Sequence, residues 1–262
     1  MPPPAKCVVY FTLEDANSVK NLFAAFKIDI IIHTATEYGR NESGSAGILN
    51  TNLILPITLL EEGIKNGAQL FINTDTYFNK PNLSYATLLD YSLSKKCLNL
   101  WLEYFSNRIK IVNLRLEHLY GDFDNSSKFC EHVIRSVAIK KEMKIKLTSG
   151  EQKRDFVYVD DVCSAYLTVL KKYDKYFFRY IQCDVGTGEA IPIKNFVKYV
   201  KEYSNSGTEL RFGAIPYRDD EIMLSVADTN FLRNWGFKAK VSFQNGIEKI
   251  INIYGNKGER LK

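Results

Sequence analysis

The sequence is poor in cysteine and contains no long apolar run. Its five cysteines are spread over 262 residues without a C-x-x-C pair, a pattern that favours reduced thiols over a disulfide framework or a zinc site. No apolar segment approaches the roughly 20 residues that a membrane-spanning helix needs, and the first residues lack the apolar stretch of a signal peptide. We therefore expect a cytoplasmic protein that binds neither a membrane nor a metal ion.

A marked excess of one charge is also missing. The 35 basic and 30 acidic residues leave a net charge of +5, and the two signs are interspersed. This falls short of the basic footprint of a nucleic-acid-binding protein, so we expect no nucleic-acid partner. A mild, diffuse positive excess suits an anionic small-molecule substrate. The composition, 45% hydrophobic and 25% charged, is that of a globular chain with one large domain or two modest ones.

Strands and helices alternate in the first half of the chain. The β-branched run at 29–33 predicts a strand buried on both faces of a parallel sheet. Apolar residues spaced three and four apart predict helices between the strands. This alternation predicts a doubly wound α/β sheet, with strands at 7–11, 29–33, 69–73 and 110–116 and helices at 15–26, 52–65 and 88–105.

The regular alternation of strands and helices ends after Gly121, and the pattern beyond it predicts a smaller lobe packed on the sheet. We expect helices at 129–140, 192–203 and 243–254, and a strand that leads into a helix at 157–171. No internal repeat and no low-complexity linker separates the two halves.

Tyr91 and Lys95 are the first candidates for chemistry. Positions i and i+4 share one face of a helix, so the phenol and the ammonium should project together. A nearby cation lowers the pKa of a tyrosine, which would give a general acid or base that works near neutral pH. The alternative is a solvated pair on the helix surface.

A cluster of hydroxyl groups follows the predicted strand at 69–73. Thr74 and Thr76 lie at the carboxyl end of that strand, where open α/β sheets bind their ligands. A threonine hydroxyl there is suited to bind a substrate oxygen or the phenol of Tyr91. The alternative is a loop whose Thr and Asp side chains bond their own backbone.

Arg154, Arg218 and Glu221 are candidates for holding a nucleotide. A guanidinium group binds two phosphate oxygens at once, and we expect both arginines to converge on one cleft and share a diphosphate. Glu221 would accept a hydrogen bond from a ribose hydroxyl. The alternative is that each arginine pairs with a carboxylate near it in sequence: Asp155 or Glu151 for the first, Asp219 or Glu221 for the second.

Taken in order, these residues resemble the extended short-chain dehydrogenase/reductase family, in its nucleotide-sugar epimerase/dehydratase branch. The resemblance runs from about residue 7 to residue 254. Within the branch, the segments 114–121 and 127–129 and the run 72–76 are similar to CDP-abequose and CDP-paratose synthases, which are 4-keto sugar reductases of O-antigen biosynthesis. The motifs that carry it are His33-Thr34-Ala35, Asn52, Thr74, Tyr91-x-x-x-Lys95, 115–121 and 154–162.

The resemblance implies an oxidoreductase that acts at C4 of a nucleotide-diphosphate sugar by hydride transfer with NAD or NADP. Catalysis would fall to Tyr91, Lys95 and Thr74, with Tyr91 moving the proton at the sugar oxygen. The cofactor would contact Thr34, Ala35, Asn52, Tyr91, Lys95 and His118, and the substrate would contact Thr76, Lys128, Arg154, Arg218 and Glu221.

The resemblance also implies how the chain is divided. Residues 1–121 would form a Rossmann-type domain for NAD(P), to which 151–180 returns, and 122–262 would form mainly a substrate lobe. We further expect a homodimer through the helix that bears Tyr91.

One family motif is missing. The family opens with a strand and a G-x-x-G-x-x-G turn, whose backbone holds the cofactor pyrophosphate at a helix N-terminus. Here the first glycine is Gly39, and Gly39, Gly44 and Gly47 follow a later strand. We therefore expect a truncated form that lacks the first strands of the sheet, at least one β-α-β unit of roughly 30 residues, and binds NAD(P)H weakly. The alternative is a catalytically inactive protein that binds a nucleotide sugar without a dinucleotide.

Overall fold

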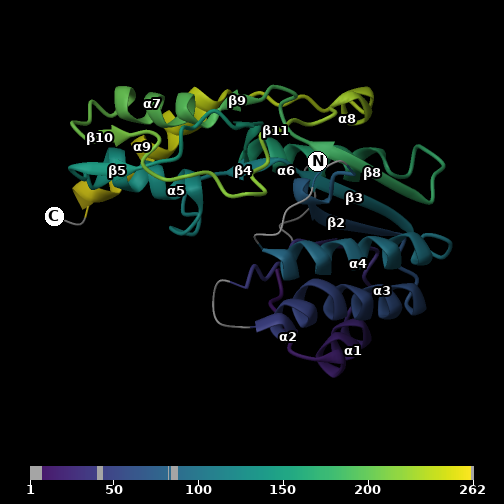
Figure 1. The fold of residues 1–262 in the computed structure, drawn as a ribbon. Helices are drawn as coiled ribbons and strands as arrows, with labels where there is room; N and C mark the ends of the chain where they lie inside the picture. The colour runs from purple at the N-terminus through teal and green to yellow at the C-terminus, as the bar shows by residue number, and fades with distance from the viewer. Residues whose placement is uncertain (1–7, 40–43, 82, 84–87, 261–262) are drawn as a thin grey trace, which may run out of the picture.

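A parallel sheet of four strands forms the centre of the first lobe (Figure 1). The structure is a computed structural model that describes residues 8–39, 44–81, 83 and 88–260. All neighbouring strands of the sheet are parallel, which confirms the predicted α/β class. Their order is β1 (Ile30–His33), β2 (Leu70–Thr76), β3 (Lys110–Leu116) and β8 (Tyr180–Val185).

Helices cover both faces of this sheet, as a doubly wound fold requires. On one face Phe71 and Ile111 pack against α1 (Ala16–Ala25), α3 (Leu55–Lys65) and α4 (Leu89–Phe105). On the other face Ile72 and Leu114 pack against α6 (Val159–Lys172) and α8 (Asn230–Asn234). A short helix, α2 (Gly44–Leu49), and a π-helical turn, η1 (Asn50–Ile54), lead into α3, and Gly67 ends α3 with a φ of +81°, the left-handed conformation that glycine adopts without strain.

Strand β1 is an edge strand, and this corrects two predictions. Its only partner among the described residues is β2. Ile32, which pairs with Ile72 on the same face of the sheet, is 44% exposed. Burial on both faces was therefore a wrong expectation for 29–33. The predicted strand at 7–11 is also wrong where it is described: residues 8–14 form no strand and are mostly exposed, and Cys7 lies outside the described residues.

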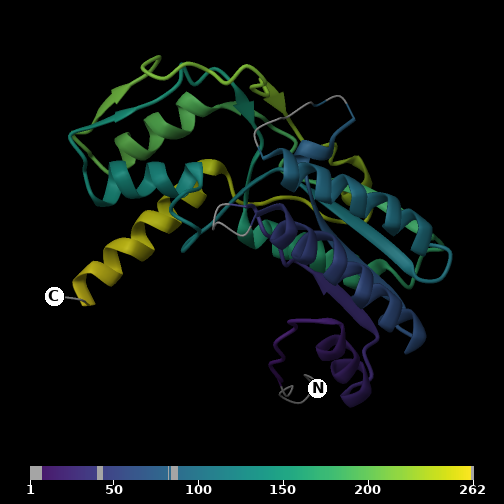
Figure 2. The ribbon, with the colours of Figure 1, turned by 60° about the horizontal axis from the view of Figure 1, so that its bottom comes forward.

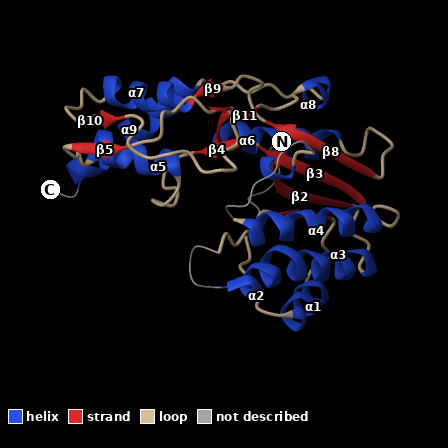
Figure 3. Ribbon diagram, viewed as in Figure 1, coloured by secondary structure: helices blue, strands red, loops and turns tan. Residues whose placement is uncertain are grey.

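The second lobe has a hydrophobic core of its own. It combines α5 (Phe129–Val133), the π-helical turn η3 (Ile134–Ile139), α7 (Ile193–Tyr203) and α9 (Phe243–Arg260) with the pair β5 (Lys144–Lys146) and β10 (Glu209–Arg211). These helices lie together, away from the large sheet (Figures 2 and 3). Phe196, Val137 and Ile247 are fully buried at the centre.

Short strands connect the two lobes. β4 (His118–Tyr120) continues from β3 and pairs with β7 (Phe156–Tyr158), which leads into α6. β6 (Lys153–Arg154) lies between β11 (Leu224–Ser225) and β9 (Ile191–Pro192). The chain therefore returns to the large sheet through α6 and β8 after entering the second lobe.

Four cysteines lie in the described part of the chain, and all four are free thiols. Cys130 and Cys183 are buried, whereas Cys163 is exposed on α6. Among the described residues, no helix is both long enough and apolar enough to span a membrane.

A ladder of polar side chains crosses the buried strands of the large sheet. Nδ1 of His33 lies 3.2 Å from Oδ1 of Asn73, and Nδ2 of Asn73 donates to Oδ1 of Asn113 at 2.7 Å. Asn113 in turn donates to Asp75 at 3.1 Å. Burial, with a smaller contribution from Lys95, lowers the pKa of His33 to about 4.

We predict that acid weakens the fold through His33. The unfolded chain binds a proton at this histidine near pH 6.5, whereas the native protein does so only near pH 4, so lowering the pH favours the unfolded state. Between pH 7 and pH 5 the free energy of unfolding should fall by about 2 kcal/mol through this residue. Urea unfolding at both pH values measures the change, which His33→Gln should reduce and His132→Gln, at an exposed position, should retain. An equal pH effect in the parent and in His33→Gln would contradict the prediction.

Candidate active site

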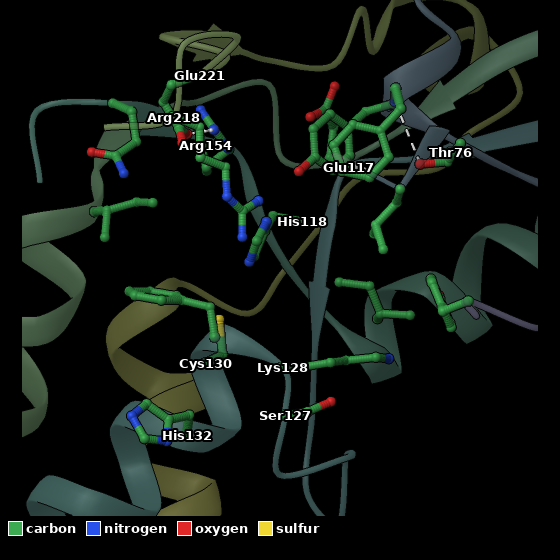
Figure 4. Close-up of a pocket in the computed structure, with 18 of the residues that line it drawn as sticks. Thr76, Glu117, His118, Ser127, Lys128, Cys130, His132, Arg154, Arg218 and Glu221 are labelled. Atoms are coloured by element: carbon green, nitrogen blue, oxygen red, sulfur yellow. Dashed lines mark hydrogen bonds and ion pairs between the residues drawn. The ribbon is translucent and has the colours of Figure 1, made fainter. Parts of the chain in front are cut away.

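A cavity of about 590 Å³ is lined by both lobes. The large sheet and its helices contribute the ends of β2 and β3, the loop after β1 and the first turn of α4. The second lobe contributes α5, the segment before β6 and the segment before β11. In Figure 4, Arg154, Arg218 and Glu221 group on one side of the cavity and Thr76 lies on the other, with Lys128 below. The polar residues of the lining include Thr36, Thr74, Thr76, Glu117, His118, Lys128, Gln152, Arg154, Arg218 and Glu221.

Tyr91 and Lys95 occupy one buried face of α4, one turn apart. The ammonium of Lys95 donates to the backbone oxygen of Thr74 at 2.9 Å and to the hydroxyl of Thr36 at 3.3 Å. Burial lowers the pKa of Lys95 to about 8, against the opposing charge of Asp75. The two residues are therefore not a solvated surface pair, because Tyr91 is 5% exposed and Lys95 1%.

The pKa of Tyr91 moves in the direction opposite to the prediction. Burial raises it well above its ordinary value, the neighbouring Tyr38 adds to the rise, and a hydrogen bond with the Thr76 hydroxyl opposes it. The ring lies 4.8 Å from that of Tyr38 and 6.4 Å from that of Phe78. The ammonium of Lys95 bonds Thr74 and Thr36, and the predicted lowering of the Tyr91 pKa is not found. Tyr91 is thus a neutral phenol, suited to donate a proton.

Of the two threonines of β2, Thr76 and not Thr74 lies beside the phenol of Tyr91. The hydroxyl of Thr74 donates to the backbone oxygen of His33 at 2.8 Å and lies 2.5 Å from the hydroxyl of Tyr166 on α6. The hydroxyl beside the phenol of Tyr91 is that of Thr76. Thr76 also begins the turn η2 (Tyr77–Asn79) by accepting from the backbone N–H of Phe78. Thr74 thus orders the strand end, and Thr76 is the better candidate for contact with a substrate.

Arg154 and Arg218 line the same cavity, and Arg154 is held by a carboxylate and by backbone oxygens. Its guanidinium donates to Glu221 at 2.6 Å and to the backbone oxygens of Lys153 and Ile222, and its side chain is 6% exposed. The predicted convergence on one cleft therefore holds. The alternative of a local pair does not hold for Arg154, whose partner is Glu221 and not Asp155 or Glu151. Glu221 faces the guanidinium. Arg218 is exposed to the cavity.

Lys128 and His118 both line the cavity, at different places. The ammonium of Lys128 bonds Asp124 at 2.8 Å and lies 5.5 Å from the ring centre of Tyr38, so it faces the Tyr91 side and not the arginines. His118 lies beside Arg154 in the cavity (Figure 4), with its ring 5.1 Å from that of Phe156. Burial, with Arg154 and Lys128 adding to it, lowers the pKa of His118 to about 3, so its imidazole is neutral.

Three residues predicted to bind the cofactor lie outside the cavity lining. Thr34 and Ala35 are exposed at the end of β1. Asn52 is completely buried, and its amide bonds the backbone N–H and C=O of Glu37 and the hydroxyl of Ser94. The Asn52 amide thus ties the loop after β1 to α4, and its contact with a cofactor stays a prediction.

A nicotinamide dinucleotide fits the residues present at one end only. Lys95, Tyr91 and Thr36 form a polar corner at the carboxyl ends of β1 and β2, the edge at which open α/β sheets bind their ligands. In the described ranges, no strand beside β1 leads into a glycine-rich turn and a helix, so no backbone cradle for the pyrophosphate is present there.

The aromatic residues that line the cavity near Tyr91 were not identified from the sequence. Tyr38 and Phe78 contact its ring, and the ring of Tyr77 lies 4.3 Å from that of Phe78. Their signal is position, because both segments directly follow strands of a parallel sheet, where ligand-binding loops gather.

A parallel α/β sheet with a helical Tyr-Lys pair at its carboxyl edge, and a second lobe that supplies arginines, defines a class of enzymes that act on nucleotide-linked substrates. The family model described as "NAD dependent epimerase/dehydratase family" matches residues 2–177 of this chain. The chain belongs to this family of nucleotide-sugar epimerases, dehydratases and reductases.

Relatives with assigned functions agree with this placement. The chain is 40% identical over 225 residues to the CDP-abequose synthase of Salmonella typhimurium, covering 84% of this chain and 75% of the relative. It is 35% identical over 234 residues to the CDP-abequose synthase of Salmonella muenchen, covering 88% of this chain and 78% of the relative.

Solved structures show the same fold. The UDP-glucose 4-epimerase of Thermotoga maritima, in a structure with UDP-glucose, superposes with a TM-score of 0.79 at 24% identity and covers 93% of this chain and 82% of the epimerase. RMD from Pseudomonas aeruginosa, complexed with NADPH, gives a TM-score of 0.77 at 18% identity, covering 96% and 89%. At these identities the likeness concerns the fold alone, and it confirms the Rossmann-type architecture.

Proposed function

We propose that the cavity binds a nucleoside diphosphate sugar and that the protein acts on C4 of that sugar as an oxidoreductase. The sugar would lie beside Tyr91 and Thr76, and the diphosphate beside Arg218 and Arg154. The observation that carries this proposal is that a buried, neutral phenol and two guanidinium groups, from different lobes, line one cavity. The two relatives named as CDP-abequose synthases support the same substrate class.

The positive side of the cavity is suited to a diphosphate. Arg218 presents an exposed guanidinium, and neutral His118 offers a ring N–H in place of a third full charge. Arg154 is shared with Glu221, so a bound diphosphate would take hydrogen bonds from a guanidinium that the carboxylate already holds in place. Charge-assisted bonds of this kind are among the strongest in proteins.

The opposite side is suited to proton transfer at a sugar oxygen. Because Tyr91 keeps its proton, it would act as the donor when an oxygen at C4 gains charge. Thr76 would orient that oxygen, and Lys95 would hold the corner formed by Thr36 and the end of β2. NAD or NADP, when bound, would supply or accept the hydride at C4.

A titration tests the proposal. Calorimetry with CDP-glucose and UDP-glucose should give saturable binding of at least one of the two with a stoichiometry near one per chain. Absence of binding at millimolar ligand would contradict the proposed substrate class.

The second candidate function is binding of the nucleotide sugar without a dinucleotide. The described residues favour it because they contain no glycine-rich turn beside β1. It predicts that NADPH fluorescence does not change on titration with the protein, with or without saturating CDP-glucose. Micromolar NADPH binding would contradict it and would support the oxidoreductase.

We also propose a homodimer through α4. Four apolar side chains of this helix are each more than half exposed: Leu89, Leu93, Leu100 and Tyr104. At 100° per residue they all fall within an arc of about 60° around the helix axis. An apolar stripe of this kind is typical of an interface. Sedimentation equilibrium tests the proposal, and a monomer at micromolar concentration would contradict it.

A further inference from the structure

A buried ion pair, Lys80 with Glu117, lies at the junction of three chain segments beside the cavity. The ammonium of Lys80 bonds one carboxylate oxygen of Glu117 and the backbone oxygen of Val226. The other carboxylate oxygen accepts from the hydroxyl of Ser225 at 2.7 Å. The Lys80 side chain is 14% exposed and that of Glu117 is fully buried.

A second ion pair, Arg115 with Asp184, adjoins the first. Asp184, at the end of β8, lies 3.4 Å from the ammonium of Lys80 and 2.7 Å from Nε of Arg115. Two cations and two anions are thus packed together at the carboxyl ends of β3 and β8. Taking such charges out of water is costly, and well-packed apolar side chains often stabilise a fold as well or better. Stability alone therefore gives little reason for the arrangement.

The segments that the pair joins carry the two ends of the site. Lys80 directly follows the turn η2, which begins at Thr76 beside Tyr91. Glu117 lines the cavity and precedes His118. Ser225 lies opposite Arg154 in the β11–β6 pair. One ion pair thus connects the sugar-side turn with the strands that hold the diphosphate-side residues.

We infer that Lys80 and Glu117 are positioning residues that set the distance between the sugar side and the diphosphate side of the cavity. The inference rests on the proposed function. The pair acts by fixing the turn that carries Thr76 against the wall that carries His118 and Arg154. Its loss should leave the grip on the nucleoside diphosphate intact and remove the additional affinity that the sugar provides.

The test compares two ligands, CDP and CDP-glucose, by calorimetry. The double variant Lys80→Met/Glu117→Met replaces the pair by apolar side chains of similar length, which avoids leaving a buried charge unpaired. In the parent we expect CDP-glucose to bind at least tenfold more tightly than CDP. In the double variant we expect the CDP affinity to stay within twofold and the ratio between the ligands to fall to within twofold of one.

The controls separate positioning from general stability. Lys65→Met removes the ion pair of the exposed Lys65 ammonium with Glu62, which lies outside the cavity lining, and should change neither affinity. The single variant Lys80→Met leaves Glu117 buried without its cation, so its melting temperature should fall below that of the double variant. Glu117→Gln keeps an acceptor oxygen for Lys80 and offers Ser225 an amide N–H in place of the second carboxylate oxygen, so it should restore part of the preference for CDP-glucose.

Two results would overturn the inference. One is an unchanged ratio between the ligands in a folded double variant. The other is an equal loss of CDP and CDP-glucose, which would assign the pair a structural role only. Failure of the parent to bind either ligand would instead contradict the proposed function itself, and the inference with it.

Discussion

Replacing both Arg154 and Arg218 with methionine is expected to weaken binding of a nucleoside diphosphate sugar by at least about a hundredfold. Each guanidinium would form charge-assisted hydrogen bonds to the diphosphate, at roughly 1.5–3 kcal/mol apiece, and about 1.4 kcal/mol corresponds to a factor of ten in affinity. Calorimetry with CDP-glucose measures the loss. Arg179→Ala is a matched control, because this exposed arginine bonds Asn107 and lies outside the cavity lining.

The two single variants should differ in how much affinity for the nucleotide sugar they lose. Arg154→Met leaves the Glu221 carboxylate beside the phosphates without its partner at 2.6 Å, so repulsion adds to the lost bonds and the effect should exceed that of Arg218→Met. Arg218→Lys should recover only part of the affinity, because an ammonium cannot bind two oxygens in the forked geometry of a guanidinium. Affinity within threefold of the parent in the double variant would end the assignment of these arginines to the diphosphate.

Tyr91→Phe is expected to lower turnover of a 4-keto nucleotide sugar by roughly 10²–10⁴, the range that proton transfer by a positioned side chain contributes. Because the phenol is neutral and buried, its removal changes no charge, and the affinity for the nucleotide sugar should stay within threefold. NADPH consumption measures the rate. Tyr104→Phe, on an exposed position of the same helix, should retain the parent rate. Equal rates in the parent and in Tyr91→Phe would show that the proton comes from another group.

Local spacing predicted the parts of the site that depend on one element. The separation of four residues places Tyr91 and Lys95 on one face of α4, because helix geometry alone decides this. The class of the sheet followed in the same way from the alternation of strands and helices. The strand β8 was missed, although its run Tyr180–Val185 completes the sheet, since it follows an irregular stretch after α6.

Properties that depend on contacts across the fold were not predictable in this way. The pKa of Tyr91 rises because Tyr38, 53 positions away in sequence, and the surrounding chain bury the ring. Thr74 is bound by the backbone of β1 and by Tyr166 of α6, neither of which a strand-end pattern reveals. The partner of Arg154 lies 67 positions away, and that of Lys80 lies 37 positions away. Tertiary packing decides this pKa and these partners, and neither composition nor periodicity predicts them.

A crystal structure of the full chain with CDP-glucose or UDP-glucose tests the central claim most directly. The account predicts that the diphosphate lies within hydrogen-bond distance, about 2.7–3.2 Å, of Arg218 and Arg154. It also predicts that the sugar lies with its C4 oxygen at the same distance from the hydroxyl of Tyr91. A ligand bound in the opposite orientation, with the diphosphate at Tyr91 and Lys128, or bound outside this cavity, would contradict it.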